Sequence, residues 1–222
     1  FTHIFNLLGT RICFLIIFVF MEEKKAFLLL NGAIPKSLPE LTNYGFVCVT
    51  DGAYNHFKNS SFVPDLVCGD FDSIEKIPEG IATCNTPDQN FTDFHKALDI
   101  LFKKGFQRID VYGASGKEQD HYLGNLSTAL EWEDKIDITF YDNYGRYFFL
   151  PKKTEIKAVQ GRTISLIPFP YAEKITSTGL EYPLQETNLT FGHRIGTRNK
   201  ALEDTVNISF CKGKLLVYIS NQ

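Results

Sequence analysis

Five short apolar runs between residues 27 and 141 alternate with segments of helical periodicity, and this alternation allows few folds. Apolar runs of this length, bounded by glycine and polar residues, are typical of buried strands. Strands that alternate with helices are typical of parallel sheets. This part of the chain is therefore predicted to be a Rossmann-like, mainly parallel sheet with helices on both faces. The predicted strands are Phe27–Leu30, Phe46–Thr50, Leu66–Cys68, Ile109–Tyr112 and Ile136–Tyr141.

Two helices are predicted between these strands, because apolar residues recur there at helical spacing. Gly105 follows the first helix as a stop signal, and Trp132 lies on the last turn of the second. The apolar positions are Phe94, Ala97, Leu98, Leu101 and Phe102 in the first helix, and Leu123, Leu126 and Leu130 in the second.

After about Gly145 the pattern changes to short alternating segments, interrupted by glycines and by prolines such as Pro168 and Pro170. This pattern predicts an antiparallel β-sandwich. We therefore expect an α/β nucleotide-binding domain over residues 21–143 and a β-sandwich domain over residues 144–222, meeting at a cleft. The clearest segments of the second domain are Thr163–Ile167, Thr205–Phe210 and Leu215–Ile219.

Residues 1–20 differ from the rest of the chain. The segment from Arg11 to Phe20 is very apolar, yet a membrane span needs about twenty such residues. It also lacks the small-residue cleavage site of a secretory signal. Met21 is the single methionine and precedes the first predicted strand. We expect the native protein to begin at Met21, with residues 1–20 as a non-native or upstream leader; a membrane anchor is the alternative.

Composition excludes several classes of protein. At 222 residues, with 44% hydrophobic and 22% charged residues, the chain resembles an ordinary globular protein. Its net charge of -3 gives no basic surface for nucleic acid. The five cysteines are scattered and form no CxxC pair, which argues against a zinc site or a disulfide framework. Cys48 and Cys68 are expected in the core of a cytoplasmic protein with no membrane partner.

Two aspartates directly follow the third predicted strand, in Gly69-Asp70-Phe71-Asp72-Ser73. In an extended chain, residues i and i+2 project to the same side. Both carboxylates are therefore expected at the carboxyl end of a strand, where open α/β sheets bind ligands. Two adjacent anions favour a hard cation such as Mg²⁺, which carboxylates often share with substrate phosphates. The alternative is a turn in which aspartate and serine cap backbone groups.

A second acidic junction runs from Asp88 to Lys96, at the start of the first predicted helix. Asp88 or Thr92 can cap this helix, and Asp93 can offset the positive end of its dipole. Asp93 is equally placed to complete a Mg²⁺ site with the aspartate pair. Lys96, one turn later, is a candidate for contact with a phosphate oxygen, or else a solvated lysine.

Two further junctions follow predicted strands. Small residues from Gly113 to Gly116 let backbone N–H groups approach a phosphate at a helix N-terminus. The spacing is not that of a P-loop, because it lacks two residues and the Ser/Thr after the lysine. The other junction runs from Asp51 to Asn55. The polar candidates after the glycines are Lys117, Asp120, His121 and Asn125, although Asp120 can also cap the helix and the last two can make structural hydrogen bonds.

Taken in order, these motifs resemble the thiamine pyrophosphokinase family. The pattern D-G-(G/A)-x-N matches Asp51 to Asn55, and G-D-x-D-S matches Gly69 to Ser73. D-x-x-x-T-D matches Asp88 to Asp93, with Gln89 in the family's usual place. The remaining matches are D-H-x-x-x-N at Asp120, His121 and Asn125, and a T-T-G-L … G … S-T-S-N signature at Ser177-Thr178-Gly179-Leu180, Phe191-Gly192, Thr197 and Asn199.

The chain departs from the family pattern at two positions. Glu118 stands where the family has an arginine, and the neighbouring Lys117 is a candidate for its role. Arg198 stands where a small serine is usual.

The resemblance implies transfer of the pyrophosphoryl group of ATP to the hydroxyl of thiamine, with AMP as product. It implies Asp70, Asp72 and Asp93 as Mg²⁺ ligands, and Asp120 as the residue that orients the hydroxyl or holds a second metal. Asp51 and Asn55 would line the phosphate-binding edge, together with Lys96, Gly113, Gly116, Lys117, His121 and Asn125. Thiamine would be bound by Gln89, Ser177, Thr197, Arg198 and Asn199.

The resemblance also implies a homodimer with active sites at the subunit interface. Two other functions remain open. A Mg²⁺-dependent phosphohydrolase also places Asp-x-Asp after a parallel strand, and the two departures are compatible with a nucleotide- or thiamine-binding protein without turnover.

Overall fold

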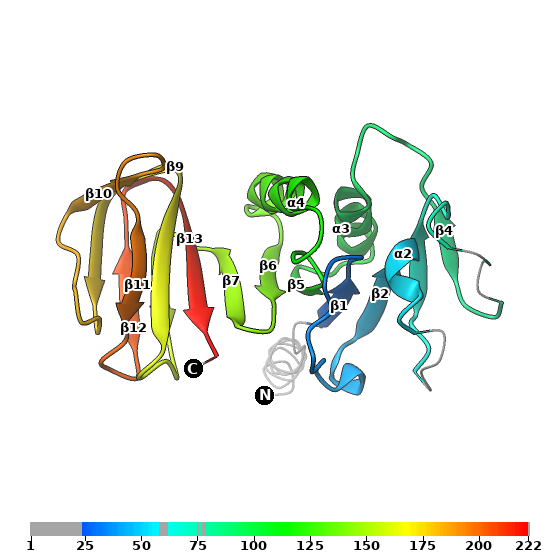
Figure 1. Cartoon of the computed structure of the whole chain (residues 1–222), viewed down its shortest axis with the longest axis horizontal. Coiled ribbons are helices and arrows are strands. Elements are labelled where there is room, and N and C mark those ends of the chain that lie inside the picture. The colour runs from blue at the N-terminus through cyan, green and yellow to red at the C-terminus, as the bar shows by residue number, and fades with distance from the viewer. Residues whose placement is uncertain (1–23, 58–61, 75, 77–78, 222) are drawn as a thin grey trace, which may run out of the picture.

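The computed structural model describes residues 24–57, 62–74, 76 and 79–221. The predicted leader and start at Met21 lie outside these residues. The described chain is elongated, with helices and parallel strands at one end and antiparallel strands at the other (Figure 1). All strands of the described residues join one hydrogen-bonded network of 13 strands. The fold is thus a mixed α/β fold built on one large sheet.

The first part of this sheet is parallel and has the order β4-β3-β2-β1-β5-β6. All five predicted strands are confirmed. The sixth, β4, was not predicted, because it is a short edge strand of three polar or half-buried residues without a periodic pattern. The strands are β1 (Lys25–Leu29), β2 (Phe46–Thr50), β3 (Leu66–Gly69), β4 (Thr83–Asn85), β5 (Arg108–Tyr112) and β6 (Asp137–Tyr141).

The two predicted helices are confirmed as α3 (Asp93–Lys103) and α4 (Gln119–Trp132). Both pack on the same face of the parallel strands, in one apolar core. The opposite face is covered by the one-turn helix α2 (Asp51–Tyr54) and the segment that contains the 3-10 turn η1 (Leu41–Asn43). Helices therefore lie on both faces, but the two long helices share one face and only short helical turns cover the other. No helix within the described ranges is long and apolar enough to cross a membrane.

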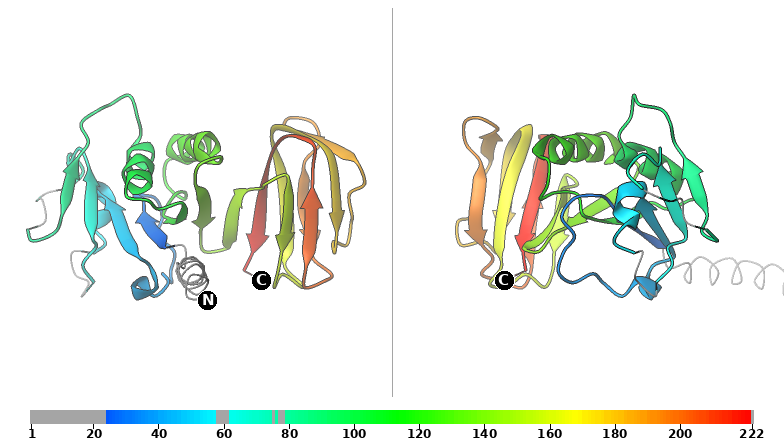
Figure 2. Two further views of the ribbon diagram at one scale, coloured as in Figure 1. Left: turned by 180° about the vertical axis from the view of Figure 1, so that it is seen from behind. Right: turned by 45° about the vertical axis from the view of Figure 1, so that its right-hand side comes forward.

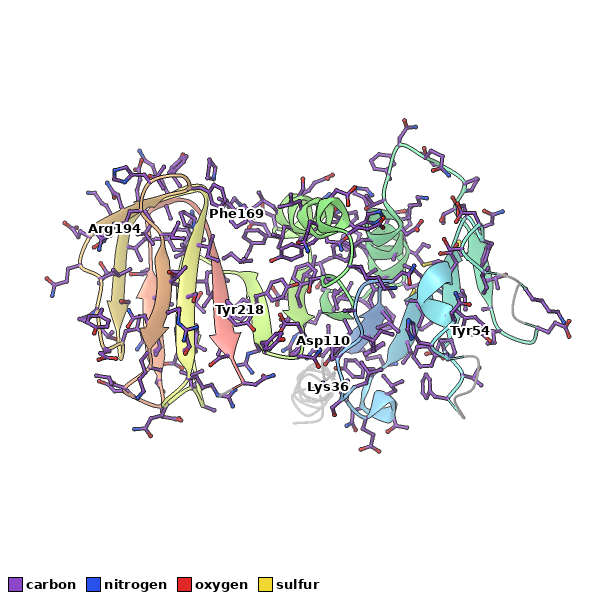
Figure 3. All side chains as sticks on the ribbon, viewed as in Figure 1. Lys36, Tyr54, Asp110, Phe169, Arg194 and Tyr218 are labelled. Atoms are coloured by element: carbon purple, nitrogen blue, oxygen red, sulfur yellow. The ribbon has the colours of Figure 1, made fainter. Side chains whose placement is uncertain are left out.

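A tight turn links the parallel strands to the rest of the molecule. Asp142 Oδ1 accepts hydrogen bonds from the N–H groups of Tyr144 and Gly145, each at 2.7 Å, and from the Tyr218 hydroxyl at 3.2 Å. Asn143 Oδ1 accepts from the N–H of Lys36 at 2.8 Å, and Figure 3 shows Lys36 and Tyr218 near this turn. Beyond it, β7 (Gly145–Phe149) pairs with β6 through two residues and with β13 (Lys212–Ser220) through five.

Every pairing from β7 onward is antiparallel. These strands surround a separate apolar core. Its centre is the long strand β9, which continues through Pro168 and Pro170; the expectation that these prolines interrupt the strand is wrong. Pro168 lies opposite a register shift at Gly213/Leu215, and prolines are tolerated at bulges. The remaining strands are β8 (Lys153–Ile156), β9 (Thr163–Thr178), β10 (Thr187–Thr190), β11 (Gly196–Lys200), β12 (Val206–Ser209) and β13 (Lys212–Ser220).

Candidate active site

Three carboxylates meet at the carboxyl ends of β2 and β3. Asp51 is the first residue of α2, and Asp70 and Asp72 follow β3. One carboxylate oxygen of each lies within 4.8 Å of the others. Asp51 is buried, while Asp72 is exposed to solvent. The aspartate pair predicted from the sequence is thus joined by a third carboxylate from the neighbouring strand.

The backbone around Gly69 and Phe71 produces this arrangement. A Cβ atom at Gly69 would lie 2.5 Å from Asp51 Cγ, so only glycine lets the two strands' ends approach this closely. Phe71 adopts a left-handed conformation with φ of 65°, and its N–H donates to Asp51 Oδ2 at 2.8 Å. The N–H of Gly52 donates to Asp51 Oδ1 at 2.6 Å. Both oxygens of the buried carboxylate are therefore held by backbone donors.

The backbone conformation that brings Asp70 and Asp72 together differs from the extended strand that was expected. β3 ends at Gly69, so the pair lies in a turn rather than in an extended strand. The N–H of Asp72 donates to Asp70 Oδ1 at 3.2 Å, and the Ser73 hydroxyl donates to Asp72 Oδ1 at 2.8 Å. The alternative of an aspartate-capped turn is thus correct for the backbone, and it coexists with the carboxylate cluster.

Burial and hydrogen bonding act in opposite directions on these carboxylates. Burial raises the pKa of Asp51, and the charges of Asp93 and Asp70 raise it further against the effect of its backbone donors. A hydrogen bond from Gln89 lowers the pKa of Asp70; Gln89 Nε2 lies 2.9 Å from Asp70 Oδ2. A bound cation would offset the repulsion at Asp51. Three carboxylates form an all-oxygen donor set, which suits a hard ion such as Mg²⁺.

Asp93 lies near this cluster but is not one of its three members. It begins α3, whose N-cap is Thr92: the Thr92 side chain accepts a hydrogen bond from the N–H of His95. Asp93 Oδ1 lies 3.2 Å from Lys96 Nζ, which also donates to the carbonyl of Thr86 at 2.8 Å. The ammonium group of Lys96 is therefore held by Asp93 at the start of α3 and by the segment after β4.

The glycine-rich segment between β5 and α4 lies against the end of β1. The N–H of Gly32 donates to the carbonyl of Gly113, and the N–H of Ala33 donates to the carbonyl of Ser115, each at 2.7 Å. A Cβ atom at Gly116 would lie 2.6 Å from the Ala33 Cβ, so glycine permits this close contact. The loop after β5 is thereby fixed at the same edge as the carboxylates.

Several other predicted residues make structural hydrogen bonds. Asn125 Nδ2 donates to the carbonyl of Ala114 at 2.8 Å. Asn55 Nδ2 donates to the carbonyls of Gly52 and Ser73, each at 3.2 Å, and so ties α2 to the aspartate turn. Asp120 Oδ1 accepts from the N–H of His121 at 2.9 Å. The His121 ring lies 3.6 Å from a Glu118 oxygen on the exposed surface of α4.

Four of the five residues expected to contact thiamine lie at the other end of the chain, while the fifth, Gln89, lies next to Asp70. Ser177 is on β9, and Thr197, Arg198 and Asn199 are on β11. Figure 1 and the left view of Figure 2 place β11 and α2 at opposite ends of the molecule. In Figure 3, Arg194, just before β11, and Tyr54 of α2 are likewise far apart. Within one chain these four residues do not meet the carboxylates.

Hydrogen bonds fix two of these distant residues. The buried Ser177 hydroxyl accepts from the N–H of Leu184 at 2.9 Å. Asn199 uses both atoms of its amide on the backbone of Tyr182, at 3.1 Å and 2.7 Å. The Tyr182 side chain is 66% exposed, so Asn199 presents an aromatic ring to solvent.

Asn31 and Tyr182 were not among the predicted site residues. Asn31 lies two residues after β1 and directly after the strand predicted at Phe27–Leu30, so the positional rule that found Asp51 and Asp70 would have found it. No comparable signal marks Tyr182, because the residue that hydrogen-bonds to its backbone, Asn199, lies elsewhere in the sequence.

Two family models match this chain. A model described as "Thiamin pyrophosphokinase, catalytic domain" matches residues 39–140. A second model, "Thiamin pyrophosphokinase, vitamin B1 binding domain", matches residues 152–215. Together they span most of the described chain, including both ends of the sheet.

Individual relatives are similar over most of their length. Thiamine pyrophosphokinase of Bacillus subtilis is 29% identical over 201 residues, which is 82% of this chain and 93% of the relative. Thiamin pyrophosphokinase 1 of Caenorhabditis elegans is 29% identical over 174 residues, 71% of this chain and 72% of the relative. The crystal structure of the B. subtilis enzyme superposes with a TM-score of 0.77 at 26% identity, covering 89% of this chain and 99% of that one. This chain belongs to the thiamin pyrophosphokinase family.

Proposed function

We propose that this chain is a Mg²⁺-dependent thiamine pyrophosphokinase, which transfers the pyrophosphoryl group of ATP to the hydroxyl of thiamine and releases AMP. The observation that carries this function is the carboxylate group of Asp51, Asp70 and Asp72 at the carboxyl edge of the parallel strands. It occurs in a chain that matches both domain models of the family.

Asp51, Asp70 and Asp72 would hold Mg²⁺, and Asp93 would support the site through its charge. When bound, the ion neutralises charge on the transferred phosphates, which is the main requirement of phosphoryl transfer. The other residues position the reactants. Asp120 is the candidate for orienting the attacking thiamine hydroxyl.

The phosphates of ATP would lie between the carboxylates and the glycine-rich loop. Gly113 and Gly116 allow close approach of the backbone, and Lys96 and Lys117 supply positive charge. Asn55 and Asn125 hold the loops in place, which is consistent with their hydrogen bonds to backbone carbonyls. His121, at the start of α4, is the last of the residues proposed to line the phosphate site.

Residues 144–222 are proposed as a β-sandwich domain that binds thiamine. The separate apolar core and the antiparallel pairings support this division, as does the match of residues 152–215. Ser177, Thr197, Arg198 and Asn199 would form the pocket from this side. Gln89 would contact thiamine from the carboxylate side, next to Asp70.

A homodimer is proposed because these two groups of residues lie at opposite ends of one chain. A second copy can bring its β11 to the carboxylates of the first, and twofold symmetry then creates two equal sites. We also propose a cytoplasmic location, since the described cysteines are all free thiols.

One experiment tests the reaction. The purified protein is incubated with ATP, Mg²⁺ and thiamine, and the nucleotide product is identified. AMP that forms only when thiamine is present supports the kinase. Release of inorganic phosphate without thiamine indicates a phosphohydrolase, and binding of ATP or thiamine without any product indicates a non-catalytic binding protein.

A further inference from the structure

Lys117 differs from the other lysine at the carboxyl edge. Lys96 is paired with the Asp93 carboxylate at 3.2 Å, so much of its charge is compensated. Lys117 Nζ instead donates to the neutral amide of Asn31, at 3.2 Å from Oδ1. Among the described residues, no carboxylate lies within ion-pair distance of Lys117. Its charge is therefore available to a ligand.

Asn31 places this charge next to the start of α2. Its amide lies directly over Gly52, where a Cβ atom would be 2.3 Å from Asn31 Nδ2. Gly52 in turn donates its N–H to Asp51. The charge of Lys117 also helps to lower the pKa of His56 just after α2, although burial is the larger cause. The ammonium group is thus held over the α2 side of the site.

The backbone on both sides of the Lys117–Asn31 contact is fixed. Leu30 donates its N–H to the carbonyl of Tyr112 at 2.9 Å, next to the bonds of Gly32 and Ala33 to the glycine-rich loop. A Cβ atom at Gly113 would lie 2.3 Å from the Leu30 carbonyl oxygen. Two tightly packed loops therefore carry the lysine and its partner.

From this geometry we infer that Asn31 is a positioning residue, which holds the uncompensated charge of Lys117 for the polyphosphate of a nucleotide. The pair sets the preference of the site for ATP over an uncharged nucleoside. This inference rests on the proposed function for the identity of the nucleotide. Beyond the proposed function, Asn31 is assigned to the site, and the Lys117–Asn31 pair distinguishes nucleotides by the charge of their phosphates.

The test measures binding of ATP and of adenosine by calorimetry, with MgCl₂ present and thiamine absent. Lys117→Met should weaken ATP binding by about tenfold or more, as expected for loss of a charged hydrogen bond. Adenosine binding should stay unchanged. Lys117→Arg, which keeps the charge, should retain most of the ATP affinity. The matched control is Lys103→Met, because Lys103 is an exposed lysine on α3 paired with Asp99.

A double-mutant cycle isolates the role of Asn31. Asn31→Ala alone should weaken ATP binding by about threefold, because the lysine loses its fixed position. In the Lys117→Met background the same change should have no further effect. An equal loss in both backgrounds, or unchanged ATP affinity in Lys117→Met, would overturn the inference. Because no thiamine is used, this result is separate from whether AMP is formed in the activity assay.

Discussion

At the scale of single residues, the candidate site depends on positions that carry no charge. Gly69 leaves room for the Asp51 carboxylate, and Phe71 turns its N–H toward the same group. A motif search finds Asp70 and Asp72 because aspartates at this spacing are recognisable. Such a search does not find the close approach of Asp51 or the left-handed conformation of Phe71, since both result from packing between β2 and β3.

Replacing a carboxylate by its neutral amide tests the proposed metal site. Asp70→Asn or Asp72→Asn should lower turnover by about 10² or more, because a ligand and its charge are lost. Steady-state assays over a range of Mg²⁺ concentrations measure this effect. Near-normal turnover with unchanged Mg²⁺ dependence would contradict the assignment. An unchanged circular dichroism spectrum and melting temperature distinguish lost chemistry from lost folding.

Two glycines allow a matched comparison of packing. Gly69→Ala should lower the free energy of unfolding by roughly 1–3 kcal/mol, because the new methyl group meets the Asp51 carboxylate. Gly124 lies within α4, where a Cβ atom would have no neighbour within 4 Å. Gly124→Ala should therefore raise stability by about 0.5–1 kcal/mol. Urea unfolding measures both; equal effects would show that space at Gly69 is not the constraint.

At the scale of helices and strands, the sequence predicted what periodicity encodes. Each apolar run predicted in the first part of the chain is a strand in the structure. Both predicted helices are also present, as α3 and α4. Strand β4 escaped prediction because an edge strand buries little. The length of β9 also escaped prediction, because tolerance of Pro168 depends on a bulge in its neighbour β13. Information carried by a partner strand is not visible in local sequence.

The N-terminus of α3 links an element to the site. Thr92→Ala removes the side-chain oxygen that accepts from the N–H of His95, and should cost about 1 kcal/mol of stability. Because α3 begins with Asp93 and carries Lys96, the loss should also weaken ATP binding. Chemical denaturation and calorimetry measure the two effects. Thr92→Ser keeps the oxygen and should behave like the unchanged protein; if it loses as much as the alanine variant, capping is not the cause.

At the scale of the whole molecule, the separation of the two residue groups can be tested by mixing variants. Asp72→Asn impairs the carboxylate end, and Asn199→Ala releases Tyr182 at the other end. Each variant alone should be nearly inactive. In a dimer with shared sites, co-refolding equal amounts gives half mixed dimers, each with one intact site, so about a quarter of full activity should return. Absence of any recovery would mean that both groups act within one chain.

The turn at Asp142 has a consequence for motion. Domains joined by a flexible linker can close on a substrate as a hinge, but here three hydrogen bonds to one carboxylate and a shared sheet replace the linker. The two ends of the chain are thereby joined by a continuous sheet and not by a free linker. Exclusion of water during the proposed reaction would then depend on loops at the carboxyl edge or on the second subunit of the proposed dimer. Small-angle X-ray scattering should accordingly give the same radius of gyration with and without substrates.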